Sequence, residues 1–267
     1  MKKDDPSGTG PARAAGAASP SGGGAARRFF ADPECFRDGG VVLDPEESRH
    51  LTRVLRLGQG HRVEVCDGCG RVVEARVERV APEGVVLTLE RELEPVVESP
   101  LYLTLAVGLA KTEALETVIR QATEMGVRRI EPFLSAFSAR PASPRLAQRL
   151  ERWRRLARES LKSCQRAFLP EIAPAAPFAR ILEGPEEVKL LCWEEERVGG
   201  LSLSLCGPRP HGVRVVVGPE GGFPPEEAAM AQEQGFRLVS LGPRRLKVET
   251  AALTIIVLIQ HAWGDLA

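Results

Sequence analysis

The chain has 267 residues, of which 43% are hydrophobic, and its 36 lysines and arginines balance 36 aspartates and glutamates. This length allows one large or two modest domains with a sizeable core. Zero net charge excludes a uniformly basic protein, so a nucleic-acid surface would need local segregation of charge. The apolar run 251–259 is too short to cross a bilayer, and no signal-peptide pattern opens the chain. We therefore expect a cytoplasmic protein.

Residues 1–26 are mainly glycine, alanine, serine and proline. Such a segment cannot bury enough apolar surface to offset the entropy of ordering, so we expect a disordered tail. Residues 27–96 instead contain short apolar or alternating stretches separated by Asp-Gly and Pro-Glu-Gly turns. These stretches are 61–66, 71–80 and 84–90. Together they predict a small β-barrel.

One helical stretch, 46–57, interrupts this β-rich segment, with Arg49, Arg53 and Arg56 opposite its apolar side. The cysteines Cys66 and Cys69 have the spacing of a metal-binding pair, but no second pair or histidine partner follows at a zinc-site distance. Asp67-Gly68 between them is typical of a hairpin turn, which is the interpretation we favour. The four histidines show no metal-ligand spacing either, and we expect no metal.

After a proline- and acid-rich linker at 94–100, strands alternate with helices, which predicts an α/β fold with a parallel sheet over 100–267. The predicted strands are 101–107, 129–134, 188–193, 213–217 and 236–241. A helix capped by Thr112 should run to Met125 and close at Gly126. A long helix should start at Ser143-Pro144. Its buried stripe should comprise Leu146, Leu150, Trp153, Ala157 and Leu161.

The last helix, 249–263, is apolar on nearly every face, so we expect it in the core or in a subunit interface. Two predicted strands end in the same dipeptide, Gly218-Pro219 and Gly242-Pro243. In parallel sheets, ligands bind beyond the carboxyl ends of the strands, and glycine allows close approach of the backbone. Neither loop has a phosphate-binding pattern, which favours a compact ligand held by main-chain groups; tight turns without a ligand remain the alternative.

The region 140–166 contains nine lysines and arginines and only two acids, Glu151 and Glu159. In a chain of zero net charge this is strong segregation. Arginine pairs with phosphate oxygens and stacks on bases, so we expect contact with nucleic acid rather than a merely solvated helix face.

Three C-terminal motifs resemble those of the RsmE-type methyltransferases, which modify N3 of a uracil in small-subunit ribosomal RNA. They are GPEGGF at 218–223, LGPRRL at 241–246 and ETAAL at 249–253. The resemblance extends to RRFF at 27–30, HLTRVLRL at 50–57, DGCG at 67–70 and the stretches 108–127 and 151–166. It covers essentially everything after the tail.

This resemblance implies a PUA-like RNA-binding barrel at 27–96 and a SPOUT methyltransferase domain at 100–267. It also implies a deep trefoil knot, binding of S-adenosylmethionine (SAM) in the knot loops, a homodimer, and 16S rRNA or the assembled small subunit as partner. The implied cofactor contacts are Leu191, Val217, Gly218, Pro219, Gly221, Gly222, Leu241, Gly242, Leu246, Val248 and Thr250. The implied RNA contacts are Arg28, Arg53, Arg56, Lys111, Arg152, Arg155, Lys162 and Arg166.

For catalysis, Arg244 and Lys247 are candidates to stabilise the anion that develops on the base as its N3 proton leaves. Glu220 and Glu249 are the nearest possible proton acceptors, and caps or loop braces are their alternative roles.

The sequence departs from the family pattern where RNA or the reacting base should lie. The departures are Lys247-Val248 for the usual Arg-Thr, Ala136-Phe137 for a frequent Glu-Arg, Gln121 for a common Lys, and Ser163 and Gln165 in a Gln-x-Gly-Arg pattern. Three functions therefore remain open: a uracil-N3 methyltransferase of 16S rRNA, a SPOUT methyltransferase with another target, and a non-catalytic RNA-binding or ribosome-assembly protein.

Overall fold

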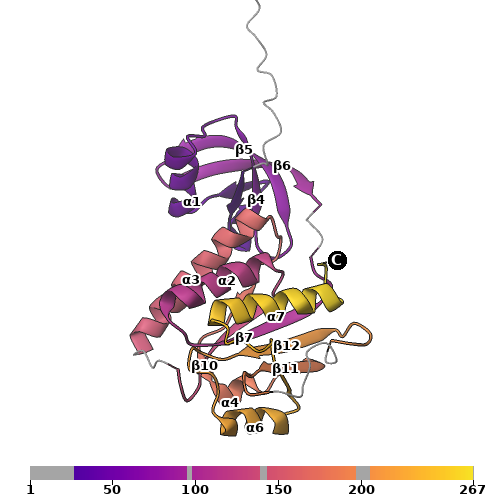
Figure 1. Cartoon of the computed structure of the whole chain (residues 1–267). Coiled ribbons are helices and arrows are strands. Elements are labelled where there is room, and N and C mark those ends of the chain that lie inside the picture. Colours follow the sequence, from indigo (N-terminus) through magenta and orange to yellow (C-terminus); the bar gives the residue numbers. More distant parts are fainter. Residues whose placement is uncertain (1–26, 95–97, 139–142, 197–204, 267) are drawn as a thin grey trace, which may run out of the picture.

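The structure, a computed structural model, describes residues 27–94, 98–138, 143–196 and 205–266 (Figure 1). The predicted tail at 1–26 lies outside the described residues. Two sheets organise the chain, a smaller N-terminal one at the top of Figure 1 and a larger C-terminal one below it. No helix in these ranges is long and apolar enough to cross a membrane.

The N-terminal sheet has six strands in the order β1-β4-β5-β6-β3-β2, antiparallel except for the β1–β4 pair. The strands are β1 (Arg28–Phe30), β2 (Phe36–Arg37), β3 (Gly40–Val42), β4 (Arg62–Cys66), β5 (Val72–Ala81) and β6 (Gly84–Leu93). A short 3-10 turn, Pro33–Cys35, follows β1. The core of this sheet includes Phe29, Leu51, Val65 and Leu87, all fully buried.

The predicted basic helix at 46–57 forms two short pieces, α1 (Pro45–Arg49) and a π-helical turn, η2 (His50–Val54). Asp44 caps α1 by accepting a hydrogen bond from the N–H of Glu47. The predicted hairpin turn is confirmed, because Asp67 Oδ1 accepts from the N–H groups of Cys69 at 2.7 Å and Arg71 at 3.0 Å.

The C-terminal sheet runs β10-β8-β7-β12-β11-β13, with β9 paired to β8, and all its pairs are parallel. The strands are β7 (Tyr102–Gly108), β8 (Arg129–Leu134), β9 (Glu171–Ile172), β10 (Ala176–Pro177), β11 (Val188–Cys192), β12 (Gly212–Val217) and β13 (Arg237–Val239). The predicted parallel α/β fold is confirmed. The two-residue strands β9 and β10 were not predicted, since they are too short to show a period.

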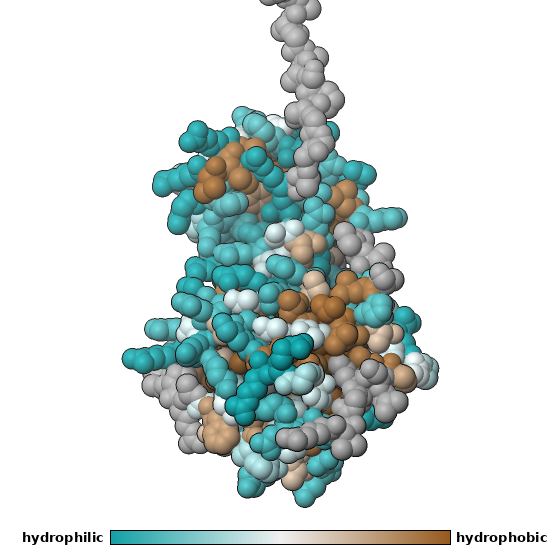
Figure 2. Space-filling view, in the orientation of Figure 1, coloured by the Kyte–Doolittle hydropathy of each residue, from teal (hydrophilic) through white to brown (hydrophobic). Residues whose placement is uncertain are grey.

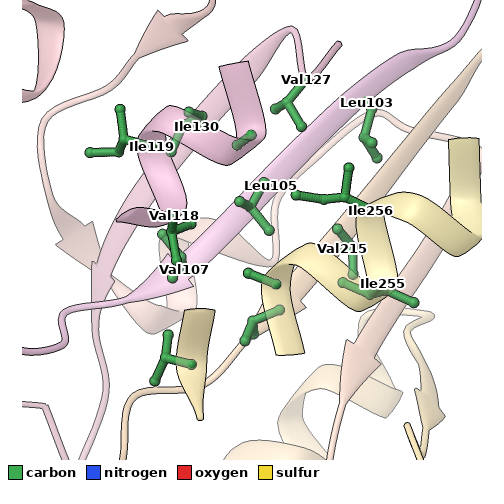
Figure 3. Close-up of a cluster of buried hydrophobic side chains, with 14 of the residues drawn as sticks. Leu103, Leu105, Val107, Val118, Ile119, Val127, Ile130, Val215, Ile255 and Ile256 are labelled. Carbon is green, nitrogen blue, oxygen red and sulfur yellow. The ribbon is translucent and has the colours of Figure 1, made fainter. Parts of the chain in front are cut away.

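Helices cover both faces of this sheet (Figure 1). On one face lie α2 (Thr112–Glu124), α3 (Ser143–Cys164) and α7 (Val248–Trp263), and on the other α4 (Phe178–Ile181) and α6 (Pro225–Glu233). Figure 3 shows Val118 and Ile119 of α2 and Ile255 and Ile256 of α7 meeting Leu105 and its neighbours on the strands. The alternation of apolar strands with amphipathic helices thus produces a three-layer core.

Two details of the helices differ from the sequence predictions. Thr112 is the first residue of α2 rather than its cap, and no side chain caps this helix. In α3, Trp153, Ala157 and Leu161 are fully buried as predicted, whereas Leu146 and Leu150 are only partly buried. At the other end of α2, Gly126 has φ +78°, as the predicted helix stop requires.

The helix α7 is buried along one face only. Ile255, Ile256 and Ile259 are fully buried, but Val257 and Leu258 are exposed. Hydrophobic atoms gather on the surface over this part of the molecule (Figure 2). The prediction of a helix packed in the core is therefore correct for one side of α7.

The two sheets are joined by a dense junction between the hairpin 66–71 and the segment 165–169. Main-chain hydrogen bonds run from Gly70 N to Ala167 O at 3.1 Å and from Leu169 N to Gly68 O at 2.8 Å. Lys162 at the end of α3 pairs with Glu47 of α1. The main-chain hydrogen bonds and the Lys162–Glu47 ion pair together join the N-terminal sheet to α3 and the segment that follows it.

Candidate functional site

A cavity of about 1020 Å³ opens at the carboxyl ends of the parallel strands. Four segments supply most of its wall: 111–117 at the start of α2, 192–195 after β11, 217–225 after β12 and 240–251 after β13. Phe137, in the loop after β8, completes it. Parallel strands bring their carboxyl ends to one edge of a sheet, which explains why segments distant in sequence meet here.

The glycine loop after β12 is packed so tightly that side chains are excluded. A Cβ atom on Gly108, at the end of β7, would lie 2.4 Å from Pro219 N. A Cβ on Gly218 would lie 2.9 Å from the Phe223 ring. Gly222 has φ +70° and closes a turn by donating to Pro219 O at 2.9 Å. The glycines of this stretch, Gly218, Gly221 and Gly222, consequently contribute only main chain to the cavity wall.

Two carboxylates brace this loop and its neighbour. Glu220 Oε1 accepts a hydrogen bond from the N–H of Lys111 at 2.8 Å. Glu227, in the first turn of α6, accepts from the N–H of Ala136 at 2.9 Å. Burial raises the pKa of Glu227, although the Ala136 hydrogen bond opposes the rise. The second oxygen of Glu227, Oε2, is buried with no hydrogen-bond partner in the described part of the chain.

The opposite wall, after β13, is open and basic. Gly242 has φ +108°, and nothing lies within 4 Å of a Cβ built there. The exposed side chains of Arg244, Arg245 and Lys247 follow, and the first turn of α7 carries Glu249. The amino end of α7 carries partial positive charge, so this wall favours an anion or a group that becomes negative.

The third wall is the segment after β11. Trp193 donates from Nε1 to Phe223 O at 3.3 Å, and its main-chain N–H donates to Val239 O at 3.0 Å. Glu194 reaches the backbone of Gly222. Burial raises the pKa of the neighbouring Cys192 thiol to about 12, so this cysteine is not a nucleophile near neutral pH.

The structure brings most of the predicted site residues together. Those that line the cavity are Lys111, Val217, Gly218, Pro219, Glu220, Gly221, Gly222, Leu241, Gly242, Arg244, Leu246, Lys247, Val248 and Glu249. Leu191 does not line it, because its side chain is fully buried in the core between the sheet, α4 and α6. Thr250 is exposed but outside the cavity wall. Sequence reasoning placed the loop after Trp193 at this edge but missed Phe137, Glu194 and Glu195 as wall residues.

Two of the predicted RNA contacts, Arg28 and Arg166, are bonded to partners inside the fold. The side chain of Arg28 is 7% exposed, donates to Glu64 at 2.9 Å and binds the carbonyl of Gln165 at 2.5 Å. Arg166 is 8% exposed and donates to Glu98 and to the carbonyl of Thr123. Both guanidinium groups already form ion pairs and hydrogen bonds within the fold, which leaves little of either for a phosphate.

The other predicted RNA contacts remain accessible to different degrees. Lys162 is partly buried against Glu47, and Arg152 is half exposed while paired with Glu116. Arg53, Arg56, Lys111 and Arg155 are exposed. These four cations are accessible to a ligand, and their contact with RNA stays a prediction.

Comparison with known proteins relates this geometry to RNA modification. The model of an RNA methyltransferase domain matches residues 97–260, and that of an RNA methyltransferase PUA domain matches residues 43–90. Over 230 residues, the chain is 34% identical to ribosomal RNA small subunit methyltransferase E of Synechocystis sp., covering 85% of this chain and 74% of that protein.

Two solved structures are similar over nearly the whole chain. Ribosomal RNA small subunit methyltransferase E from Neisseria gonorrhoeae, bound to S-adenosyl methionine, is 29% identical with a TM-score of 0.82, over 91% of this chain and 100% of that one. A Legionella pneumophila protein with bound SAM is 30% identical with a TM-score of 0.84, over 90% and 99% of the two chains.

Proposed function

This chain belongs to the RNA methyltransferase family of the ribosomal RNA small subunit methyltransferase E type, and we propose that it methylates N3 of a uridine in 16S rRNA. SAM is its methyl donor, as in the similar structures that contain it. The observation that carries the proposal is the cavity at the strand ends, whose glycine-rich walls present main chain from two opposing loops.

The residues present fit SAM. The loops 218–222 and 241–242 offer backbone N–H and C=O groups to a flat adenosyl group, because their glycines have no side chain to block its approach. The wall also carries both signs of charge, which suits a ligand with a carboxylate, an ammonium and a sulfonium. Negative charge comes from Glu113, Glu194, Glu195, Glu220 and Glu249, and positive charge from Lys111, Arg244, Arg245 and Lys247. When bound, SAM supplies an electrophilic methyl group.

Residues of the chain would remove the N3 proton of the base and stabilise the charge that develops on it. The N3–H of uracil is weakly acidic, so methylation requires loss of that proton and stabilisation of the resulting charge. Arg244 and Lys247 are exposed in the cavity and are proposed to stabilise the developing anion. Glu220 already accepts a main-chain hydrogen bond, which favours a bracing role for it. Glu249 is therefore the preferred candidate for the proton acceptor.

The finer architecture is also a proposal. We assign residues 27–96 to a PUA-like RNA-binding domain and 100–267 to a SPOUT domain with a trefoil knot. We also propose a cytoplasmic location and a homodimer. Support for the homodimer comes from α7, which leaves Val257 and Leu258 exposed beside its buried face. Arg53, Arg56, Lys111 and Arg155 are the proposed RNA contacts, with Arg152 and Lys162 at the margin of that surface.

The decisive experiment combines calorimetry with mass spectrometry. The purified protein should bind SAM with a measurable heat, and small-subunit rRNA from a strain lacking the gene should lose 3-methyluridine. Binding of SAM with unchanged 3-methyluridine, and loss of a different methylated nucleotide, would support the alternative of another target. Absence of SAM binding would leave the non-catalytic RNA-binding role.

A further inference from the structure

Phe137 is a large aromatic side chain that stands in the cavity wall with 55% of its surface exposed. By contrast, Phe133, Phe178 and Phe223 are buried and pack on one another, with Phe133 and Phe223 stacked and Phe178 tilted against both. The ring of Phe137 thus has a face directed at solvent within the site rather than at a partner in the fold.

The loop that carries this ring is fixed in position. Ser135 N donates to Ser138 Oγ at 3.1 Å, and Ser138 N donates to Ser135 O at 3.2 Å, which closes a tight turn. The N–H of Ala136 is held by Glu227 of α6 at 2.9 Å. An exposed ring on a braced turn is prepared for contact, since little conformational entropy remains to be lost on binding.

The side chain of Phe137 also packs against the glycine loop. A Cβ atom on Gly221 would lie 2.7 Å from the Cβ of Phe137, so only glycine permits this approach. The neighbouring residue, Glu220, is the one bound to the N–H of Lys111. Phe137 is therefore built into the same braced unit as the cofactor loop, and it lines the same cavity as Arg244 and Lys247.

The size of the cavity provides room for two groups. At about 1020 Å³ it lies at the upper limit of the range of about 300–1,000 Å³ that is usual for a single small-molecule site. A base that is modified by an enzyme has to leave its stack and enter the site, where aromatic side chains commonly replace the lost stacking.

We propose that Phe137 is a base-stacking residue, whose exposed ring receives the face of the target base or of the nucleotide beside it when the RNA enters the cavity. The inference rests on the proposed methyltransferase function and deepens it, because it names a specificity contact on the substrate side. An uncharged ring at this position recognises a base by its π-face rather than by its charge or hydrogen bonds.

The test compares three substitutions, Phe137→Leu, Phe137→Ala and Phe137→Trp, with Tyr102→Leu as the matched control. Tyr102 is an aromatic residue of similar exposure, 45%, at the amino end of β7 and outside the cavity wall. The measured quantities are the Kd of SAM by calorimetry, and KM and kcat with unmodified small ribosomal subunits from a strain lacking the gene.

Loss of base stacking is expected to raise KM for the subunits by between about 5-fold and 150-fold in the Leu and Ala variants, the factors that correspond to about 1–3 kcal/mol. The Trp variant should stay within about threefold of the wild type, and all variants should bind SAM within about twofold of the wild-type Kd. A wild-type KM in Phe137→Leu would overturn the inference, because leucine keeps the apolar volume without the π-face. A parallel loss of SAM affinity would also overturn it, by making the ring part of the cofactor wall.

The methyltransferase function and the stacking role of Phe137 are tested by different results. A wild-type protein that neither binds SAM nor methylates the subunits would remove the methyltransferase function and this inference with it. An active wild type with unaffected Phe137 variants would remove the inference alone.

Discussion

The N–H of Lys111 donates to the carboxylate of Glu220 at 2.8 Å, which ties the amino end of α2 to the glycine loop after β12. If Glu220 acts as a brace, Glu220→Gln should retain most activity, because the amide oxygen still accepts this hydrogen bond. Glu220→Ala should weaken SAM binding by about 10- to 150-fold, since hydrogen bonds to charged groups contribute about 1.5–3 kcal/mol. Calorimetry with SAM and steady-state kinetics check both variants. A loss of kcat in Glu220→Gln with normal SAM affinity would instead identify Glu220 as the proton acceptor.

Arg244 is exposed in the cavity and makes no hydrogen bond or ion pair within the described ranges. A side chain that acts on the developing anion should affect turnover more than cofactor affinity. We expect Arg244→Ala to lower kcat by about 100- to 1,000-fold, the usual effect of removing one donor to a developing anion, with an unchanged Kd for SAM. Arg237→Ala, an exposed arginine at the amino end of β13, is the control. Equal losses in kcat and SAM affinity would make Arg244 a binding residue.

Gly108 sits where β7 meets the turn at Pro219, and a methyl group there would contact Pro219 at 2.4–2.5 Å. Gly108→Ala should displace the glycine loop, costing about 1–3 kcal/mol of stability and weakening SAM binding by at least about tenfold. Gly58→Ala is the matched control, because nothing lies within 4 Å of a Cβ at that position. Thermal unfolding and calorimetry measure the two effects. Normal SAM affinity in a destabilised Gly108→Ala protein would show that SAM binding does not depend on the packing of the glycine loop against β7.

The raised pKa of the partly buried Glu227 carboxyl predicts that the stability of the fold depends on pH. Burial raises the pKa of this carboxyl in the folded protein above its unfolded value of 4.5. Its contribution to stability is therefore fully present below the unfolded pKa and is lost as the pH rises through the folded pKa. The variant Glu227→Gln keeps an acceptor for the N–H of Ala136 but cannot ionise, so it should gain stability relative to the wild type as the pH rises above 4.5. Chemical unfolding at several pH values measures this, and parallel curves for the two proteins would contradict it.

Periodicity and turn chemistry were enough to predict the parallel sheet, the helix stop at Gly126 and the Asp67-Gly68 hairpin. The helix stop and the hairpin are local features determined by neighbouring residues, and the sheet followed from the alternation of apolar strands with helices. The convergence of the Gly218 and Gly242 turns also followed from the sequence, because parallel strands have to end at the same edge.

What the sequence could not show is which charged residues are paired within the fold, because their partners lie far apart in the chain. Charge density made Arg166 look like an RNA contact, but its acid partner, Glu98, is 68 residues away. Arg28 is bound by the carbonyl of Gln165, 137 residues along the chain. No local sequence pattern predicts a pair between residues so far apart. Phe137 was noted only as a departure from the family pattern, since a single aromatic residue in a loop does not reveal that it faces a cavity.

The junction between the hairpin 66–71 and the segment 165–169 links the N-terminal sheet to the part of the molecule that holds the cavity. Its main-chain hydrogen bonds restrict changes in the distance between the two. An RNA that contacts both would have to place its reacting nucleotide at that distance. We therefore expect a folded ribonucleoprotein, which holds its nucleotides at fixed distances, to be a better substrate than a short flexible RNA.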